Sequence, residues 1–188
     1  MTSCDSVLLL SGGRGRGKST VLERVFQEAA AAGIVLAGVL SRRVPSGIHA
    51  VLLPDQTEFP LALYTIDSPA GEITLGPYRF SRDAVTRVNA HLCGVPANTD
   101  AAIVDEIGPL ELKRSGGFLP GLNHLLTLPI PLVVVIRPEL LTDLTQLIER
   151  AGRRVAHKIA DPRPSKEAVR IICDYITSSE MFSRNDDL

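Results

Sequence analysis

The chain has 188 residues, of which 45% are hydrophobic and 22% charged, and its formal net charge is −1. This length predicts one domain with a single substantial core, and the balanced charge gives no strong nucleic-acid signal. No apolar run reaches the roughly 18 residues of a membrane helix, and three widely spaced cysteines without metal-ligand spacing are typical of a cytoplasmic protein.

A glycine-rich stretch, VLLLSGGRGRGKST, occupies residues 7–20. The apolar residues 7–11 predict a buried strand, and residues 18–32 predict a helix with one apolar face. Between them, the spacing Gly12-x4-Gly17-Lys18-Ser19 is the phosphate-binding P-loop pattern, in the strand–loop–helix context that it requires. Lys18 is expected to reach the β- and γ-phosphates of a nucleoside triphosphate, and Ser19 to ligate Mg²⁺. The predicted nucleotide-binding residues are Gly12, Gly13, Arg14, Gly15, Arg16, Gly17, Lys18, Ser19 and Thr20.

Several basic residues near this loop have two readings. Arg14 and Arg16 occupy its variable positions, where they either contact phosphate or remain solvated. Arg42 and Arg43 follow the second predicted strand, residues 34–41, and are likewise candidates to contact the nucleotide. His157 follows the last predicted strand, near which a nucleotide base often packs.

The middle of the chain does not show the alternation of strands and helices seen in the first 41 residues. Residues 44–80 predict an antiparallel hairpin insertion that widens an otherwise parallel sheet. Ser81 is a plausible N-cap for the helix that follows, with Val85, Val88 and Leu92 facing inward.

The second half returns to alternating strands and helices. Strands are predicted near 101–106, 131–137 and 153–159, a short helix within 116–128, and longer helices over 138–151 and after Ser165. The fold class is therefore α/β, a three-layer P-loop NTPase fold with a mainly parallel sheet. We expect one domain over residues 1–180 and a C-terminal tail over 181–188.

Two adjacent carboxylates end one of the buried strands, AAIVDEIG, at Asp105 and Glu106. The carboxyl ends of parallel strands line the ligand crevice, so Asp105 is placed to support Mg²⁺, as a Walker B aspartate does. Glu106 points differently and is a candidate to polarise an attacking water. Arg137 ends another buried strand. If that strand lies between the strands of the P-loop and Asp105, Arg137 meets the γ-phosphate; otherwise it is a solvated strand end.

Together with the P-loop, the segment VDEIGPLELKRSGGF at 104–118 resembles the thermophilic-type nucleoside-triphosphatase family. The resemblance covers roughly residues 5–160, and Asp-Glu-Ile-Gly-x-x-Glu-Leu at 105–112 is its diagnostic part. It implies Mg²⁺-dependent hydrolysis of ATP, GTP and other nucleoside triphosphates with loose base selectivity. It also implies a strand inserted between the P-loop strand and the Asp105 strand, with Glu106 as catalytic base.

The chain departs from the family pattern at Pro109-Leu110, where relatives often carry Lys-Met. If that lysine assists catalysis, its loss lowers or regulates activity here. Glu111 matches the second glutamate of the motif without an assigned role.

Two other functions use the same loop. A small-molecule kinase would activate a hydroxyl in place of water, and would need an acceptor site. A slow nucleotide-dependent switch would act through a protein partner, with the 44–80 insertion as a docking surface.

Overall fold

The computed structural model describes residues 6–183 except residue 14, residues 65–71, residue 161 and residues 163–164. The prediction for Arg14 and the termini of the chain therefore lie outside the described residues. Among the described residues, the strands form one nine-stranded sheet, in the order β5-β6-β4-β3-β2-β7-β8-β1-β9. Their bounds are β1 Ser6–Ser11, β2 Leu36–Val44, β3 Gly47–Leu53, β4 Thr57–Tyr64, β5 Glu72–Leu75, β6 Tyr78–Ser81, β7 Ala101–Ile107, β8 Leu132–Ile136 and β9 Arg154–Ala160.

The parallel half of the sheet consists of β9, β1, β8, β7 and β2. Every residue of β1 and β8 is buried, as expected for strands covered on both faces. Strand β8 lies between β1 and β7, so the inserted strand implied by the family resemblance is present. All these strands end at one edge of the sheet, which brings residues far apart in sequence together there.

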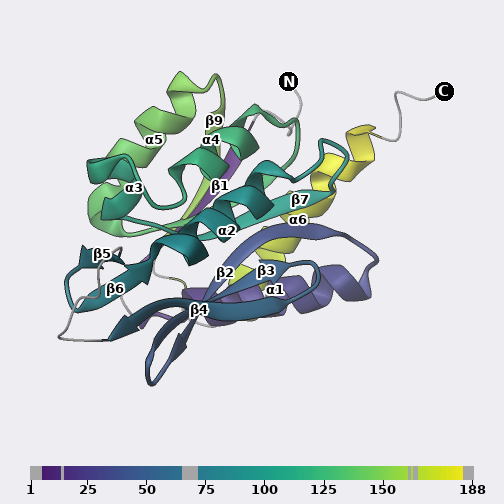
Figure 1. Ribbon diagram of the computed structural model, residues 1–188. Helices are drawn as coiled ribbons and strands as arrows, with labels where there is room; N and C mark the ends of the chain where they lie inside the picture. Colours follow the sequence, from purple (N-terminus) through teal and green to yellow (C-terminus); the bar gives the residue numbers. More distant parts are fainter. Residues whose placement is uncertain (1–5, 14, 65–71, 161, 163–164, 184–188) are drawn as a thin grey trace.

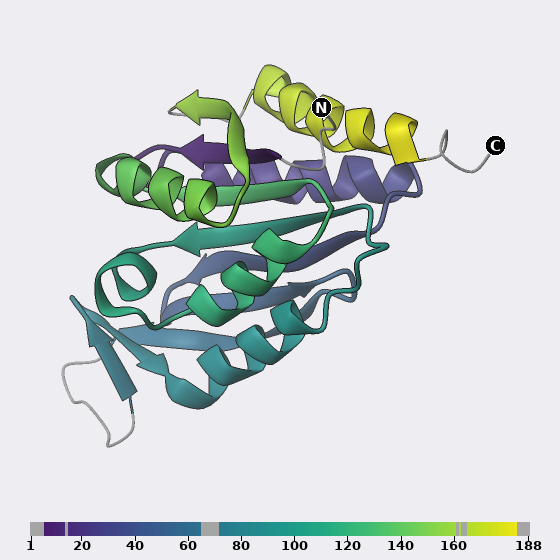
Figure 2. The ribbon, with the colours of Figure 1, turned by 90° about the horizontal axis from the view of Figure 1, so that it is seen from above.

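Helices cover both faces of the sheet and complete three layers (Figures 1 and 2). Helices α1 (Lys18–Ala31) and α6 (Lys166–Ser183) pack on one face, through Val21, Val25, Val169 and Ile172. The other face is covered by α2, α4 and α5, and α3 lies at its end. Their bounds are α2 Arg82–Cys93, α3 Pro109–Arg114, α4 Leu119–Thr127 and α5 Leu141–Arg150. The predicted three-layer α/β fold is confirmed.

The antiparallel half consists of β3, β4, β6 and β5, attached to the parallel half through β2. The predicted antiparallel addition to a mainly parallel sheet is therefore confirmed. At its end, the Ser81 hydroxyl accepts a hydrogen bond from the Ala84 amide at 3.2 Å, which caps α2 as predicted. The helix then buries Val85, Val88 and Leu92.

Three elements differ from the sequence prediction. Helix α3 was not predicted, because its six residues are too short to show a helical period. The helix predicted over 138–151 is divided into a 3₁₀ turn, Pro138–Leu140, and α5. The last helix continues to Ser183, beyond the start of the predicted tail, and residues 184–188 lie outside the described residues.

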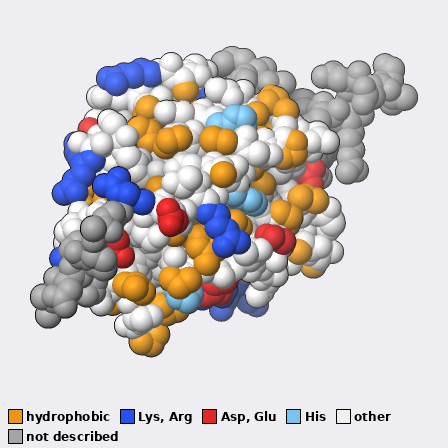
Figure 3. Space-filling view, viewed as in Figure 1, with side chains coloured by type: hydrophobic (Ala, Val, Ile, Leu, Met, Phe, Trp, Pro, Cys, Tyr) orange, Lys and Arg blue, Asp and Glu red, His pale blue; other side chains and the backbone are white. Residues whose placement is uncertain are grey.

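The surface is mixed in character. Figure 3 shows basic, acidic and hydrophobic side chains interspersed over the face viewed. Within the described ranges, every helix is too short or too polar to cross a membrane.

Candidate nucleotide-binding and catalytic site

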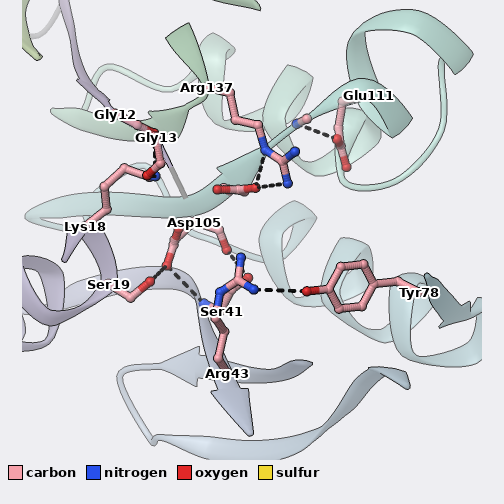
Figure 4. Close-up of polar contacts among 12 residues, drawn as sticks. Gly12, Gly13, Lys18, Ser19, Ser41, Arg43, Tyr78, Asp105, Glu111 and Arg137 are labelled. Carbon is pink, nitrogen blue, oxygen red and sulfur yellow. Dashed lines mark hydrogen bonds and ion pairs between the residues drawn. The ribbon is translucent and has the colours of Figure 1, made fainter. Parts of the chain in front are cut away.

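A cavity of about 580 Å³ opens at the edge where β1, β7 and β2 end. The residues following β1 and β8 contribute Lys18 and Arg137 to its wall, and β7 contributes Asp105 and Glu106. Figure 4 shows Lys18, Asp105 and Arg137, which come from separate elements of the fold. The predicted constellation is thus assembled in one place.

The loop after β1 has the backbone of a phosphate-binding turn. Gly15 and Gly17 have φ values of 75° and 79°, a left-handed conformation that glycine adopts without steric cost. Gly17 is the N-cap of α1, so the helix begins at Lys18 and directs the positive end of its dipole into the cavity. The Lys18 ammonium donates to the carbonyls of Gly12 and Gly13, at 2.6 and 2.9 Å. These contacts hold the lysine across the loop.

The Asp105 carboxylate faces the start of α1. Its Oδ2 accepts from the Ser19 hydroxyl at 2.9 Å and from the Ser41 amide at 3.3 Å. The Ser41 hydroxyl also donates to the Asp105 carbonyl, at 2.5 Å. Burial raises the pKa of Asp105 to about 7, and the neighbouring Glu106 charge adds to this. The hydrogen bonds from Ser19 and Ser41 and the charge of Lys18 oppose the rise.

Glu106, the residue after Asp105, contacts Arg137. The Arg137 Nε and Nη2 atoms both donate to Glu106 Oε1, at 3.0 and 2.9 Å. Arg137 follows β8, which lies between β1 and β7, so the condition for placing it beside the phosphates is met. The sequence did not indicate its direct pairing with Glu106.

Glu111 is a positioning residue that the sequence left without a role. Its carboxylate is buried, and it accepts from the Gly108 amide at 2.8 Å and the Phe118 amide at 2.9 Å. It thereby caps the N-terminus of α3 by accepting from the N-cap amide, and it ties the loop after α3 to the end of β7. Burial raises the pKa of Glu111, against the lowering effect of these two amides. Gly117 fits beside it because a Cβ there would lie 1.9 Å from Glu111 Oε1.

The remaining predicted residues are placed as follows. Arg16, Thr20, Arg42 and Arg43 line the cavity together with Gly15, Gly17 and Ser19. Arg42 is paired with Glu23 and Glu58. His157 lies within β9, opposite Leu8, rather than after the end of the strand as expected.

The polar end of the cavity fits Mg²⁺. Ser19 Oγ and Asp105 Oδ2 lie 2.9 Å apart, and hydroxyl and carboxylate oxygens are the hard donors that Mg²⁺ prefers. Among the described residues, no group of three or more His, Cys, Asp or Glu side chains forms an all-protein metal site.

The opposite wall of the cavity was missed by sequence reasoning. It is apolar and comes mainly from the antiparallel half, with contributions from α2, α3 and the loop after α3. Its side chains include Ile48, Leu61, Leu75, Phe80, Val85, Leu110 and Phe118. Arg43 and Tyr78 add a polar pair, in which Arg43 Nη1 donates to the Tyr78 hydroxyl at 3.0 Å.

A glycine-rich loop joining β1 to α1, an Asp-Glu pair on β7 and a strand inserted between them define a P-loop NTPase. Over residues 7–163, the chain matches the sequence model of a family described as NTPase. The chain belongs to this family, which makes it a nucleoside-triphosphate hydrolase.

Individual relatives agree with this placement. The chain is 29% identical over 140 residues to the nucleoside-triphosphatase THEP1 of Thermococcus kodakarensis, covering 69% of this chain and 74% of the relative. The crystal structure of THEP1 from the hyperthermophile Aquifex aeolicus has a similar fold, with a TM-score of 0.54 at 18% identity. That similarity covers 90% of this chain and 96% of the other.

Proposed function

We propose that the protein hydrolyses nucleoside triphosphates to the diphosphate and phosphate in a Mg²⁺-dependent reaction, with broad base tolerance and with Glu106 activating water. One observation carries the proposal. Glu106 lines the same cavity as Lys18, next in sequence to an aspartate that contacts the P-loop serine. The residue that would accept a proton from the attacking water and the residues that would bind the phosphates therefore line the same cavity.

Each described side chain has a task in this reaction. Lys18 and the amides at the start of α1 hold the β- and γ-phosphates. Ser19 and Asp105 are the residues that hold Mg²⁺, which neutralises phosphate charge when bound. Broad base tolerance is expected because all of these contacts are made to phosphate and metal.

The pairing of Arg137 with Glu106 sets the geometry of the base. Both arginine nitrogens use Oε1, and within the described part of the chain no protein donor contacts Oε2. Oε2 is thus available to accept a hydrogen bond from the attacking water. Arg137 also places a positive charge where negative charge develops on the transferring phosphoryl group.

The test is phosphate release from Mg²⁺-ATP and Mg²⁺-GTP by wild type and Glu106→Gln. We expect kcat to fall by about 10²-fold or more, because the amide cannot accept a proton, while nucleotide affinity is retained. Glu58→Gln is the matched control, since Glu58 lies on β4 and is absent from the cavity wall. Equal rates in wild type and Glu106→Gln would refute the assignment of the base.

The same experiment separates hydrolysis from a slow regulatory switch. Phosphate release that begins only when a protein partner is added favours the switch. Steady turnover by the purified chain favours the hydrolase.

A further inference from the structure

The cavity measures about 580 Å³, and only part of its wall carries the polar groups that phosphates, Mg²⁺ and an attacking water would contact. The rest of the wall is apolar. Cavities of about 300–1,000 Å³ with mostly apolar walls and a few polar groups are typical of sites for small organic molecules. The apolar wall named above therefore needs an occupant other than water.

The position of the apolar wall excludes the nucleoside as that occupant. Across the sheet edge, the order is β1 with the P-loop, β8 with Arg137, β7 with Glu106, then β2 and the antiparallel half. The apolar side chains of β3, β4 and β6 thus lie beyond Glu106, on the side away from the P-loop. The nucleoside is joined to the α-phosphate, at the opposite end of the triphosphate from the γ-phosphoryl group. The apolar wall consequently faces the γ-phosphoryl end.

The cavity wall also carries a cationic side chain, that of Arg43. Arg43 lines the cavity, and among the residues that the structure describes it forms no ion pair, only the contact with the Tyr78 hydroxyl. Tyr78 is buried, and its hydroxyl lies 2.6 Å from that of Tyr64. Ser41, two residues before Arg43 on β2, contacts Asp105. A spacing of two strand residues is about 7 Å, so Arg43 lies within one small molecule's length of the reactive end.

We propose that this part of the cavity binds a second substrate, a small ring-bearing alcohol with an anionic substituent, and that its hydroxyl accepts the γ-phosphoryl group in place of water. The ring packs on Leu61, Phe80 and Phe118, and the anion pairs with Arg43. The hydroxyl oxygen bonds to the γ-phosphorus, and the bond from that phosphorus to the β–γ bridging oxygen breaks. The nucleoside diphosphate leaves with that electron pair, and Glu106 takes the hydroxyl proton. The transfer step rests on the proposed role of Glu106 as base.

The first experiment measures binding of 4-(hydroxymethyl)benzoate by saturation-transfer NMR in the presence of Mg²⁺ and ADP. We expect binding to wild type, and at least a tenfold loss in Leu75→Trp and Ile48→Trp, whose added rings fill the apolar part. Leu63→Trp is the matched control, since Leu63 is 42% exposed on β4 and absent from the cavity wall. Retained ADP affinity shows that each variant is folded. Absent binding to wild type, or equal binding to all variants, overturns the site.

The second experiment tests the anion contact. Benzyl alcohol lacks the carboxylate, so wild type is expected to prefer 4-(hydroxymethyl)benzoate by about tenfold, the effect of a charge-assisted hydrogen bond. Arg43→Ala is expected to abolish this preference. Arg42→Ala is expected to retain it, because Arg42 is already paired with Glu23 and Glu58. A preference that persists in Arg43→Ala overturns the assignment of the arginine.

The third experiment incubates wild type with Mg²⁺-ATP and 4-(hydroxymethyl)benzoate and identifies the products by mass spectrometry. A phosphorylated alcohol is the expected product, lost in Glu106→Gln. Binding without transfer, while phosphate is still released to water, overturns the acceptor role and leaves the proposed hydrolase intact. Failure to release phosphate from Mg²⁺-ATP in a parallel incubation without the alcohol, while wild type still binds the alcohol, refutes the proposed hydrolase instead.

Discussion

The parallel and antiparallel halves of the sheet contribute to the same cavity in different ways. In the parallel half, strands such as β1 and β8 are buried along their whole length, and their ends carry Lys18, Glu106 and Arg137 into the site. In the antiparallel half, β4 buries only Leu61 and Ala62, and the residues that this half contributes to the cavity are mainly apolar. The comparison shows that the parallel half supplies the charged groups, Arg43 on β2 included, whereas the antiparallel half supplies a mainly apolar wall.

The largest predicted effect tests whether the catalytic groups come from the parallel half alone. Arg137→Ala is expected to lower kcat by about 10²-fold or more, with a smaller change in KM, because its charge is used mainly in the transition state. Arg79→Ala is the control from β6, since Arg79 is outside the cavity wall and contacts the carbonyls of Gly76 and Tyr78. Steady-state kinetics measure both. A comparable loss of kcat in Arg79→Ala would mean that the antiparallel half takes part in the chemistry.

The next prediction concerns stability at the amino-terminal ends of the parallel strands β1 and β9. Arg153 is buried, and its Nη2 donates to the carbonyls of Ser6 and Ile130 at 2.6 and 2.7 Å. Arg153→Met leaves the Ile130 carbonyl without this donor, while the Ser6 carbonyl keeps the Tyr175 hydroxyl at 2.7 Å, and is expected to lower the free energy of unfolding by about 1–3 kcal/mol. Urea denaturation measures the change.

Its counterpart tests the antiparallel half. The Arg87 guanidinium lies 4.2 Å from the centre of the Phe59 ring, an exposed contact for which Arg87→Met is expected to cost about 1 kcal/mol or less. If Arg153→Met and Arg87→Met lower the free energy of unfolding equally, the contact in the parallel half does not contribute more to stability than the contact in the antiparallel half.

The pH dependence of stability has an unusual sign at Asp105. Its pKa is about 7 in the folded protein, against an ordinary 3.8, so between these values the folded state holds a proton that the unfolded state has released. The stability linked to this group is fully present below about pH 4 and is lost as pH rises to about 7. Without Mg²⁺, the slope reaches about −1.4 kcal/mol per pH unit. Denaturation in EDTA at several pH values measures it.

Asp105→Asn is the control for this pH effect. The amide does not titrate, so the decline in stability between pH 4 and 7 is expected to flatten. A decline of unchanged slope in Asp105→Asn would assign the proton to another group of the site.

A further prediction compares helix caps from the two halves. Ser81 caps α2 at the end of the antiparallel half, and Ser165 caps α6 through the Ala168 amide at 3.1 Å. Each serine-to-alanine change is expected to cost about 1 kcal/mol, because one amide at the helix start loses its acceptor. Thermal denaturation measures both. A cost several times larger at Ser81 would show that the cap also anchors the antiparallel half.

Much of the fold followed from local patterns. The P-loop context around β1 and α1, the buried strands β7 and β8, and the antiparallel insertion were all predicted, because each has its own apolar period or turn signals. Helix α3 was missed, since its six residues are too few to show a helical period.

The sequence by itself determined the chemical groups: a phosphate loop, a hydroxyl and carboxylate for metal, and a second carboxylate for water. Their positions at strand ends, together with parallel strand order, predicted that they meet. The tertiary structure alone decided which partners they take. Arg137 pairs with Glu106, Glu111 holds the loop after α3, and Arg43 joins Tyr78 on an apolar wall. These contacts join residues from separate elements, and their geometry depends on the register and packing of the whole sheet, which no local pattern encodes.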